Sequence, residues 1–152
     1  MTKRVHGGTR CPGCRKQAEI CVCTGIESGE TTHQLAIIQH PMELWRSSNT
    51  VGLVTAHLPS THLFIRGDPD DEFALRKLVA APGTRGFMVF PEPGAAEVGA
   101  VAAAMDPAGP KPLWIILDGS WRQARRMRRR VAARYGIQAV SLSPDYTSGF
   151  RV

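Results

Sequence analysis

From residue 34 onward, short apolar runs alternate with segments of helical periodicity, and this alternation constrains the fold more than any other feature. The apolar runs at 35–38, 63–65, 86–90, 113–117 and 139–142 are typical of strands buried on both faces of a sheet. Helical patterns cover 51–58, 69–80, 95–105 and 121–135. The sequence therefore predicts an α/β fold, with a mostly parallel sheet and helices on both faces.

All four cysteines lie near the N-terminus, in the pairs Cys11-x-x-Cys14 and Cys21-x-Cys23. Four thiolates at this spacing suit a tetrahedral zinc ion, which would be structural because no coordination position stays open. Two disulfides or a redox pair are the alternatives, and a cytosolic chain seldom keeps disulfides. We expect residues 1–33 to form a small N-terminal zinc-binding segment with its linker, and residues 34–152 to form the α/β domain.

The composition and the N-terminus argue against a membrane-spanning or secreted protein. Hydrophobic residues make up 43% of the chain and charged residues 21%, as in ordinary globular proteins. No apolar run approaches the roughly 20 residues that a membrane span needs. The N-terminus is polar and lacks the apolar segment of a secretory signal. We therefore expect a cytoplasmic protein with no membrane partner.

The positive charge of the chain is concentrated in one segment. Seven arginines lie between residues 122 and 134, and subtracting them from the formal net charge of +6 leaves −1 for the rest. Apolar residues in this segment recur at spacings of three and four, which predicts a buried stripe of Trp121, Ala124, Met127, Val131 and Tyr135. The opposite face would carry Arg122, Arg125, Arg126, Arg129 and Arg130. Such a face is typical of proteins that bind a polyanion, although a merely solvated helix face is the alternative.

Polar residues follow the predicted strands, at the edge where parallel sheets bind their ligands. Ser120 and Gln123 fit a capping box at the head of the arginine helix. The unpaired N–H groups of that helix end could hold a carboxylate or a phosphate. Asp118 would face this anion site, or else bond to backbone N–H groups of its own turn.

A second polar cluster follows the first strand. His40 and Glu43 come directly after it, and Asn49 or Thr50 can cap the next helix. A histidine at a strand end is either a hydrogen-bonded structural residue or a catalyst, and the sequence leaves both open. Trp45 has no obvious place in the core, so it either stacks on a base or covers a loop.

In order and spacing these motifs resemble the DTW-domain family of tRNA-uridine aminocarboxypropyltransferases, which are related to the SPOUT methyltransferases. The match runs from the cysteine pairs through Gln39-His40-Pro41-x-Glu43, Ser48-Asn49-Thr50 and Phe90-Pro91 to residues 117–124. The family signature is Asp-x-Thr-Trp. Ser120 replaces the threonine here and keeps the hydroxyl group that a helix cap requires.

The resemblance implies a SPOUT-like or Rossmann-like fold and a transferase that acts on tRNA. Such an enzyme transfers the 3-amino-3-carboxypropyl group of S-adenosylmethionine to N3 of a uridine. The implied catalytic residues are Asp118, His40 and Glu43, and the exposed arginines would bind RNA. The implied cofactor-binding residues are Gly119, Ser120, Trp121, Pro91, Asn49 and Thr50.

The chain ends shortly after the last predicted strand, whereas members of the family usually continue. The α/β domain is therefore expected to lack its C-terminal part, and a partner chain could cover the unfinished sheet edge in a homodimer. Three other functions stay open: a SPOUT-like RNA methyltransferase, a non-catalytic zinc-stabilised RNA-binding module, and a zinc-stabilised interaction domain.

Overall fold

The computed structural model describes residues 9–46 and 48–142. The polar N-terminus and the C-terminal segment 146–152, on which the expectation of a missing C-terminal part rests, lie outside the described residues. Within them, no helix is long and apolar enough to cross a membrane.

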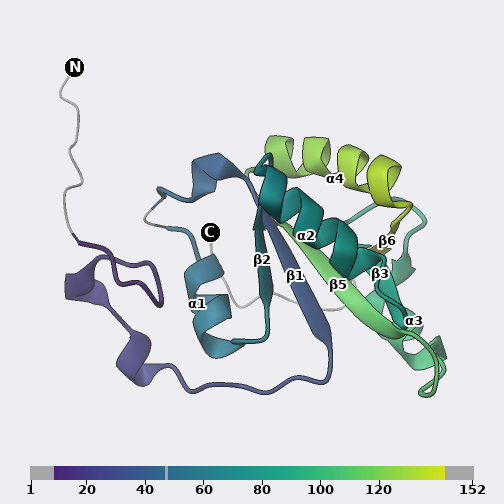
Figure 1. Ribbon diagram of the computed structural model, residues 1–152, viewed down its shortest axis with the longest axis horizontal. Coiled ribbons are helices and arrows are strands. Elements are labelled where there is room, and N and C mark those ends of the chain that lie inside the picture. The colour runs from purple at the N-terminus through teal and green to yellow at the C-terminus, as the bar shows by residue number, and fades with distance from the viewer. Residues whose placement is uncertain (1–8, 47, 143–152) are drawn as a thin grey trace.

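Six parallel strands form one sheet in the order β2-β1-β5-β3-β6-β4 (Figure 1). The strands are β1 Gln34–Gln39, β2 His62–Ile65, β3 Thr84–Val89, β4 Ala96–Glu97, β5 Lys111–Asp118 and β6 Gln138–Ser141. The helices are α1 Val51–His57, α2 Pro69–Val79, α3 Val98–Ala104 and α4 Trp121–Tyr135. Short 3-10 helices occupy Ala18–Ile20, Cys23–Gly25 and Pro41–Glu43. The predicted α/β class is therefore confirmed.

The long strand β5 lies inside the sheet, between β1 and β3. Its residues Leu113 and Ile115 are fully buried on one face, and Trp114 is nearly buried on the other. The parallel register pairs Gln39, the last residue of β1, with Asp118, the last residue of β5. Two polar side chains therefore end neighbouring strands on the same face of the sheet.

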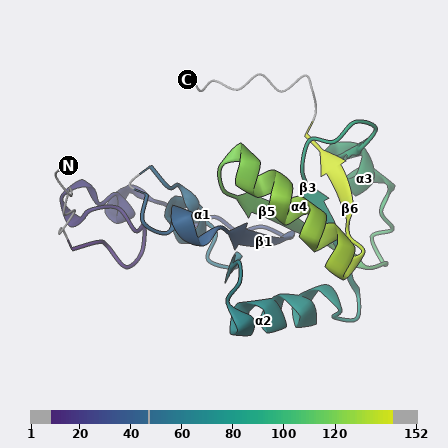
Figure 2. The same ribbon diagram turned by 90° about the horizontal axis from the view of Figure 1, so that it is seen from above.

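Helices cover both faces, as predicted. One core lies between the sheet and helices α2 and α4, where Leu75, Met127 and Val131 are buried. On the opposite face, Phe87 and Trp114 pack against apolar residues of α3. Figure 2 shows α4 lying across β5, with α2 and α3 on either side of it.

The N-terminal segment lies beside α1 (Figure 1). The backbone carbonyl of Cys14 packs directly on Gly52, where a Cβ atom would come within 2.3 Å of the carbonyl oxygen. Further along, the backbone N–H of Gly29 donates to the carbonyl of His57 at 2.6 Å. Cys14 is the one buried residue among the described residues 9–33, so the segment has no apolar core of its own.

The third helix begins later than its sequence pattern predicts. The alanine-rich run was expected to be helical from residue 95, but Ala96–Glu97 forms the short edge strand β4 and α3 begins at Val98. Pairing with β6 and a hydrogen bond from the Ser141 hydroxyl to the Ala95 carbonyl at 3.3 Å hold this strand. These tertiary contacts override the helix propensity of alanine.

We predict that Gly52→Ala lowers the free energy of unfolding by about 1–3 kcal/mol, because the added Cβ atom would overlap the Cys14 carbonyl. Urea unfolding of the metal-loaded protein measures the change. Gly25→Ala is the matched control, since nothing lies within 4 Å of the position of its Cβ atom. An equal loss of stability in both variants would show that the contact between Cys14 and Gly52 is not the cause.

Candidate functional site

The four cysteines gather into one cluster. Their Sγ atoms all lie within 4.8 Å of one another. The Cys11 and Cys23 sulfurs are 3.4 Å apart and those of Cys14 and Cys21 are 3.9 Å apart. These separations exceed a disulfide bond and come close to the ~3.8 Å expected between thiolates that share a tetrahedral zinc ion. The cluster could therefore hold a metal ion such as zinc.

Local backbone geometry favours the thiolate form of Cys14, whereas contacts with the Cys11 and Cys14 sulfurs raise the pKa of Cys23. The backbone N–H of Cys11 donates to the Lys16 carbonyl at 2.8 Å, which closes the first pair into a tight loop. Hydrogen bonds from the backbone N–H groups of Val22 and Lys16 lower the pKa of the Cys14 thiol to about 6. Such N–H groups stabilise a thiolate, the form of cysteine that coordinates zinc.

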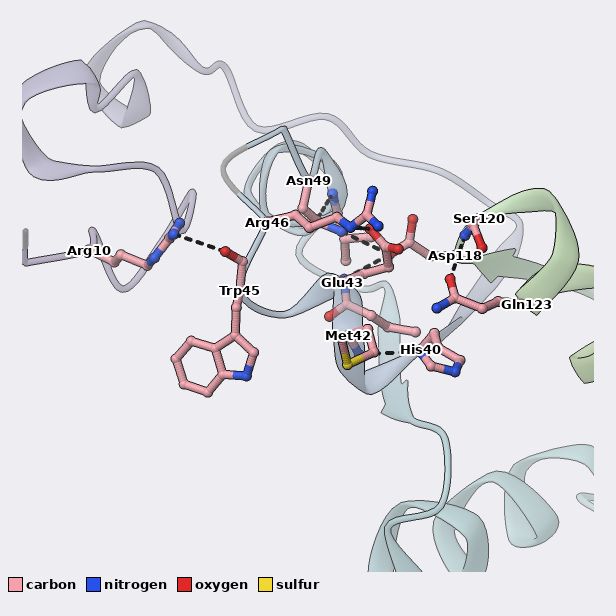
Figure 3. Close-up of polar contacts among 12 residues, drawn as sticks. Arg10, His40, Met42, Glu43, Trp45, Arg46, Asn49, Asp118, Ser120 and Gln123 are labelled. Atoms are coloured by element: carbon pink, nitrogen blue, oxygen red, sulfur yellow. Dashed lines mark hydrogen bonds and ion pairs between the residues drawn. The ribbon is translucent and has the colours of Figure 1, made fainter. Parts of the chain in front are cut away.

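The carboxylate of Asp118 is held by two side-chain amides. Its Oδ2 atom accepts hydrogen bonds from Gln39 Nε2 at 2.8 Å and from Asn49 Nδ2 at 2.9 Å. Within the described residues Oδ1 has no hydrogen-bond partner, so one carboxylate oxygen is fixed and the other remains available. Figure 3 shows Glu43, Arg46 and Asn49 gathered around Asp118. We call Gln39, Glu43, Asn49 and Asp118 the carboxylate cluster.

Gln39 is a member of this cluster that was not among the predicted site residues. It is fully buried at the end of β1, directly after four apolar residues of the same strand. The feature that identifies Gln39 is its register with the candidate aspartate on the neighbouring strand. Sequence reasoning missed it because the sequence alone does not reveal which strands are neighbours.

Asn49 connects Asp118 to α1. Its Oδ1 atom accepts a hydrogen bond from the backbone N–H of Val51 at 3.0 Å, so both ends of its amide are occupied. Asn49, and not the exposed Thr50, therefore caps the first turn of α1 through its side chain. Thr50 contributes only its carbonyl, which accepts from the N–H groups of Leu53 and Val54.

Glu43 is the one buried acidic residue among the described residues. Its Oε2 atom pairs with Arg46 Nε at 3.2 Å, whereas the buried Oε1 atom has no hydrogen-bond partner. Buried polar atoms in proteins normally have a hydrogen-bond partner, so a water molecule or a ligand group would satisfy Oε1. Glu43 lies near Asp118 without a direct hydrogen bond to it among the described residues (Figure 3).

His40 directly follows β1, next to this cluster, and is neutral. The backbone N–H of Met42 donates to its Nδ1 atom at 3.2 Å. A ring nitrogen that accepts a hydrogen bond carries no proton, so Nε2 holds the proton and can donate. Burial and the charge of Arg66 lower the pKa of His40, while Glu43 acts in the opposite direction. His40 is therefore suited to donate a hydrogen bond more than to accept a proton.

The head of α4 has the predicted capping box, in which Gln123 Oε1 accepts from the Ser120 backbone N–H at 2.7 Å. Gly119 permits this close turn, because a Cβ atom there would lie 3.1 Å from the side chain of Gln123. The buried stripe is confirmed for Ala124, Met127 and Val131.

The prediction that Trp121 belongs to this buried stripe is wrong. Its side chain is 59% exposed and stacks on Phe90, with ring centroids 5.2 Å apart. The first turn of α4 extends beyond the edge of the sheet, so helical periodicity alone does not bury it. Pro91 follows Phe90 and is exposed. Trp45 is also exposed, and its indole points away from Asp118 (Figure 3).

The arginines of α4 divide into two groups. Arg128 pairs with Glu92 and Arg134 with Glu72. The other five are exposed and form no ion pair with the described residues: Arg122, Arg125, Arg126, Arg129 and Arg130. We call these five the arginine face, and they are the five that the sequence predicted to point away from the sheet.

A groove of about 600 Å³ lies between α2 and α4. Its walls include Phe64, Leu75 and Met127, and Arg130 lines it as well. Leu117 packs into the core on this face, so the next strand residue, Asp118, points to the opposite face. The carboxylate cluster and this groove are therefore separate features.

We predict that the stability of the protein falls as the pH drops below about 6.5. The unfolded chain protonates His40 near its ordinary pKa of 6.5, whereas the folded chain does so only at a lower pH. Between these two pKa values the unfolded state binds more protons, so acid favours unfolding. His40→Asn, which can still accept from Met42, should flatten this part of the profile in urea unfolding from pH 7.5 to 5. Identical profiles for both proteins would contradict the assignment.

Comparison with known families agrees with this geometry. A search of the solved structures found no significant match. A family model described as the DTW domain matches residues 8–152, which include the cysteine cluster, the carboxylate cluster and the arginine face. The chain therefore belongs to the DTW-domain family.

Proposed function

We propose that this protein is an S-adenosylmethionine-dependent tRNA-uridine aminocarboxypropyltransferase. Membership of the DTW family supports the reaction class, because this domain is known in aminocarboxypropyltransferases. The observation that carries the proposal is the Asp118 carboxylate, which two amides hold at the carboxyl end of β5. It lies four residues before Arg122, the first residue of the arginine face. An oriented proton acceptor and a phosphate-binding surface thus adjoin the same turn.

The reaction requires a proton acceptor and an aligned nucleophile. In the transfer, uridine N3 forms a bond to the aminocarboxypropyl carbon that is attached to the sulfonium sulfur. The bond between this carbon and sulfur breaks, and its electron pair moves to sulfur. Methylthioadenosine leaves, and the N3 proton passes to a base. The free Oδ1 atom of Asp118 would accept this proton or align the uracil ring for in-line attack. The Nε2–H group of His40 would donate a hydrogen bond to a uracil carbonyl.

The head of α4 supplies a place for the methionine carboxylate. The Ser120 N–H is already bonded to Gln123, which leaves the next N–H groups of the first turn to bind an anion. Gly119, Ser120, Trp121 and Pro91 would surround the donor, and the buried unpartnered Oε1 atom of Glu43 would accept from its amino group. Asn49, whose amide is fully engaged, serves as a support for Asp118 in this arrangement.

The arginine face would bind the tRNA backbone, and the cysteine cluster would hold a structural zinc ion. Five exposed arginines on one helix offer charge to several phosphates, so the affinity for tRNA should fall steeply with salt. The four thiolates fill every position of a tetrahedral ion, which leaves zinc no open position for chemistry.

We predict that the carboxypropyl carbons of S-adenosylmethionine, and not its methyl carbon, enter tRNA. Incubating the zinc-loaded protein and tRNA with cofactor labelled in either position separates the outcomes. Methyl label in the tRNA would instead indicate a methyltransferase. The absence of both labels, together with tRNA binding, would indicate a non-catalytic RNA-binding module and overturn the proposal.

Asp118→Asn should lower the transfer rate by ~10²-fold or more, because an amide cannot accept the proton. Its Oδ1 atom can still accept from Gln39 and Asn49, so folding and tRNA affinity should change little. Asp106→Asn, at an exposed turn before β5, is the control and should retain full activity. Full activity in Asp118→Asn would exclude Asp118 as the base.

Replacing Arg125 and Arg126 by glutamine should weaken tRNA binding and reduce its salt slope by about one per arginine. The matched control replaces Arg85 and Lys111 by glutamine. These substitutions remove the same charge at the opposite edge of the sheet, where β3 and β5 begin. Filter binding at several salt concentrations measures both variants. Equal losses in the two double variants would indicate a non-specific effect of net charge and reject the arginine face as the binding surface.

A further inference from the structure

Arg15 has a backbone conformation that no other described non-glycine residue shares. Its φ angle is +59°, in the left-handed region that side chains disfavour. Residues persist in this region when their surroundings determine the conformation. Here Arg15 follows Cys14, whose carbonyl packs on Gly52, and its own carbonyl accepts from Arg10 at 3.0 Å.

This conformation directs the Arg15 side chain toward the carboxylate cluster. Its guanidinium donates to Gln39 Oε1 at 3.5 Å, and the other end of the same amide, Nε2, donates to Asp118. The cation and the carboxylate therefore orient the buried Gln39 amide from opposite ends. A chain of polarised hydrogen bonds of this kind is stronger than its separate members.

The next residue contacts the second support of Asp118. Lys16 Nζ donates to the backbone carbonyl of Asn49 at 2.9 Å, and Asn49 Nδ2 donates to Asp118. The two residues that hold Asp118 are thus contacted by two consecutive residues: Arg15 bonds to the side-chain amide of Gln39, and Lys16 bonds to the backbone carbonyl of Asn49. Both residues come directly after Cys14, a member of the cysteine cluster.

We propose that Arg15 and Lys16 are positioning residues that fix the Asp118 carboxylate through Gln39 and Asn49. The cysteine cluster would then have a task beyond holding its own segment together, because a metal bound there would fix the backbone from which both side chains project. The catalytic consequence of this arrangement rests on the proposed function, whereas the arrangement itself can be tested without any activity.

The test follows the side-chain amide protons of Gln39 and Asn49 by NMR in the zinc-loaded protein. Arg15→Gly removes the guanidinium and keeps a residue that adopts the left-handed conformation without strain. We expect the Gln39 amide protons to exchange about tenfold faster in this variant, with those of Asn49 little changed. Lys16→Met should have the opposite effect and speed exchange at Asn49. Glu19→Ala, an exposed change in the same segment, is the control and should alter neither.

Zinc content, measured for every variant, ensures that the comparison is made at equal metal loading. Removing zinc with a chelator should speed exchange of the side-chain amide protons of both Gln39 and Asn49. A variant that combines Arg15→Gly and Lys16→Met should show the same effect. Unchanged amide exchange in Arg15→Gly, or equal changes at both amides in each single variant, would overturn the proposal.

An activity measurement separates this proposal from the proposed function. If the wild-type protein transfers the carboxypropyl group, Arg15→Gly should lower kcat about tenfold or more with the KM for S-adenosylmethionine little changed, since Asp118 would be misplaced. Arg15→Lys, which keeps a cationic donor, should restore part of the rate. An unchanged kcat in Arg15→Gly would contradict the positioning role. A wild-type protein without activity would reject the proposed function, and the amide exchange would still decide the role of Arg15.

Discussion

Parallel pairing of β1 with β5 is the interaction on which the candidate site depends. Because Gln39 and Asp118 end the two strands in register, an amide and a carboxylate that are 79 residues apart in sequence meet at 2.8 Å. A shift of one residue would turn one of the two side chains to the opposite face of the sheet. The apolar strand residues that precede them hold this register, so packing in the core determines the chemistry at the edge.

The N-terminal segment obtains its stability in a different way from the sheet. Cys14 is its one buried residue among those described, so burial of apolar surface contributes little to its folding. Four closely spaced thiols and hydrogen bonds to α1 take that role, and a metal ion would supply the folding free energy that the missing core does not. The segment then contacts the carboxylate cluster through Arg15 and Lys16, which connects the cysteine cluster to the packed sheet.

The periodicity of the sequence predicted most of the fold because strands and helices here have clear local signals. Asp118, Glu43 and the cysteine cluster were found from motifs and strand ends. Gln39 and Arg15 were missed, since strand order and a left-handed backbone are set by tertiary contacts. Trp121 was misplaced because the helical pattern continues past the edge of the sheet that would bury it.

The two faces of the sheet limit how an RNA could reach Asp118. The arginine face belongs to α4, which covers one side, whereas alternation along β5 points Asp118 to the other side. The two features meet only at the turn formed by Gly119 and Ser120. Under the proposed function, a nucleotide whose phosphates contact α4 would have to extend its base around this turn. A base that is paired and stacked in a helix must first unpair and unstack to extend in this way, so the geometry favours an unpaired uridine as the substrate.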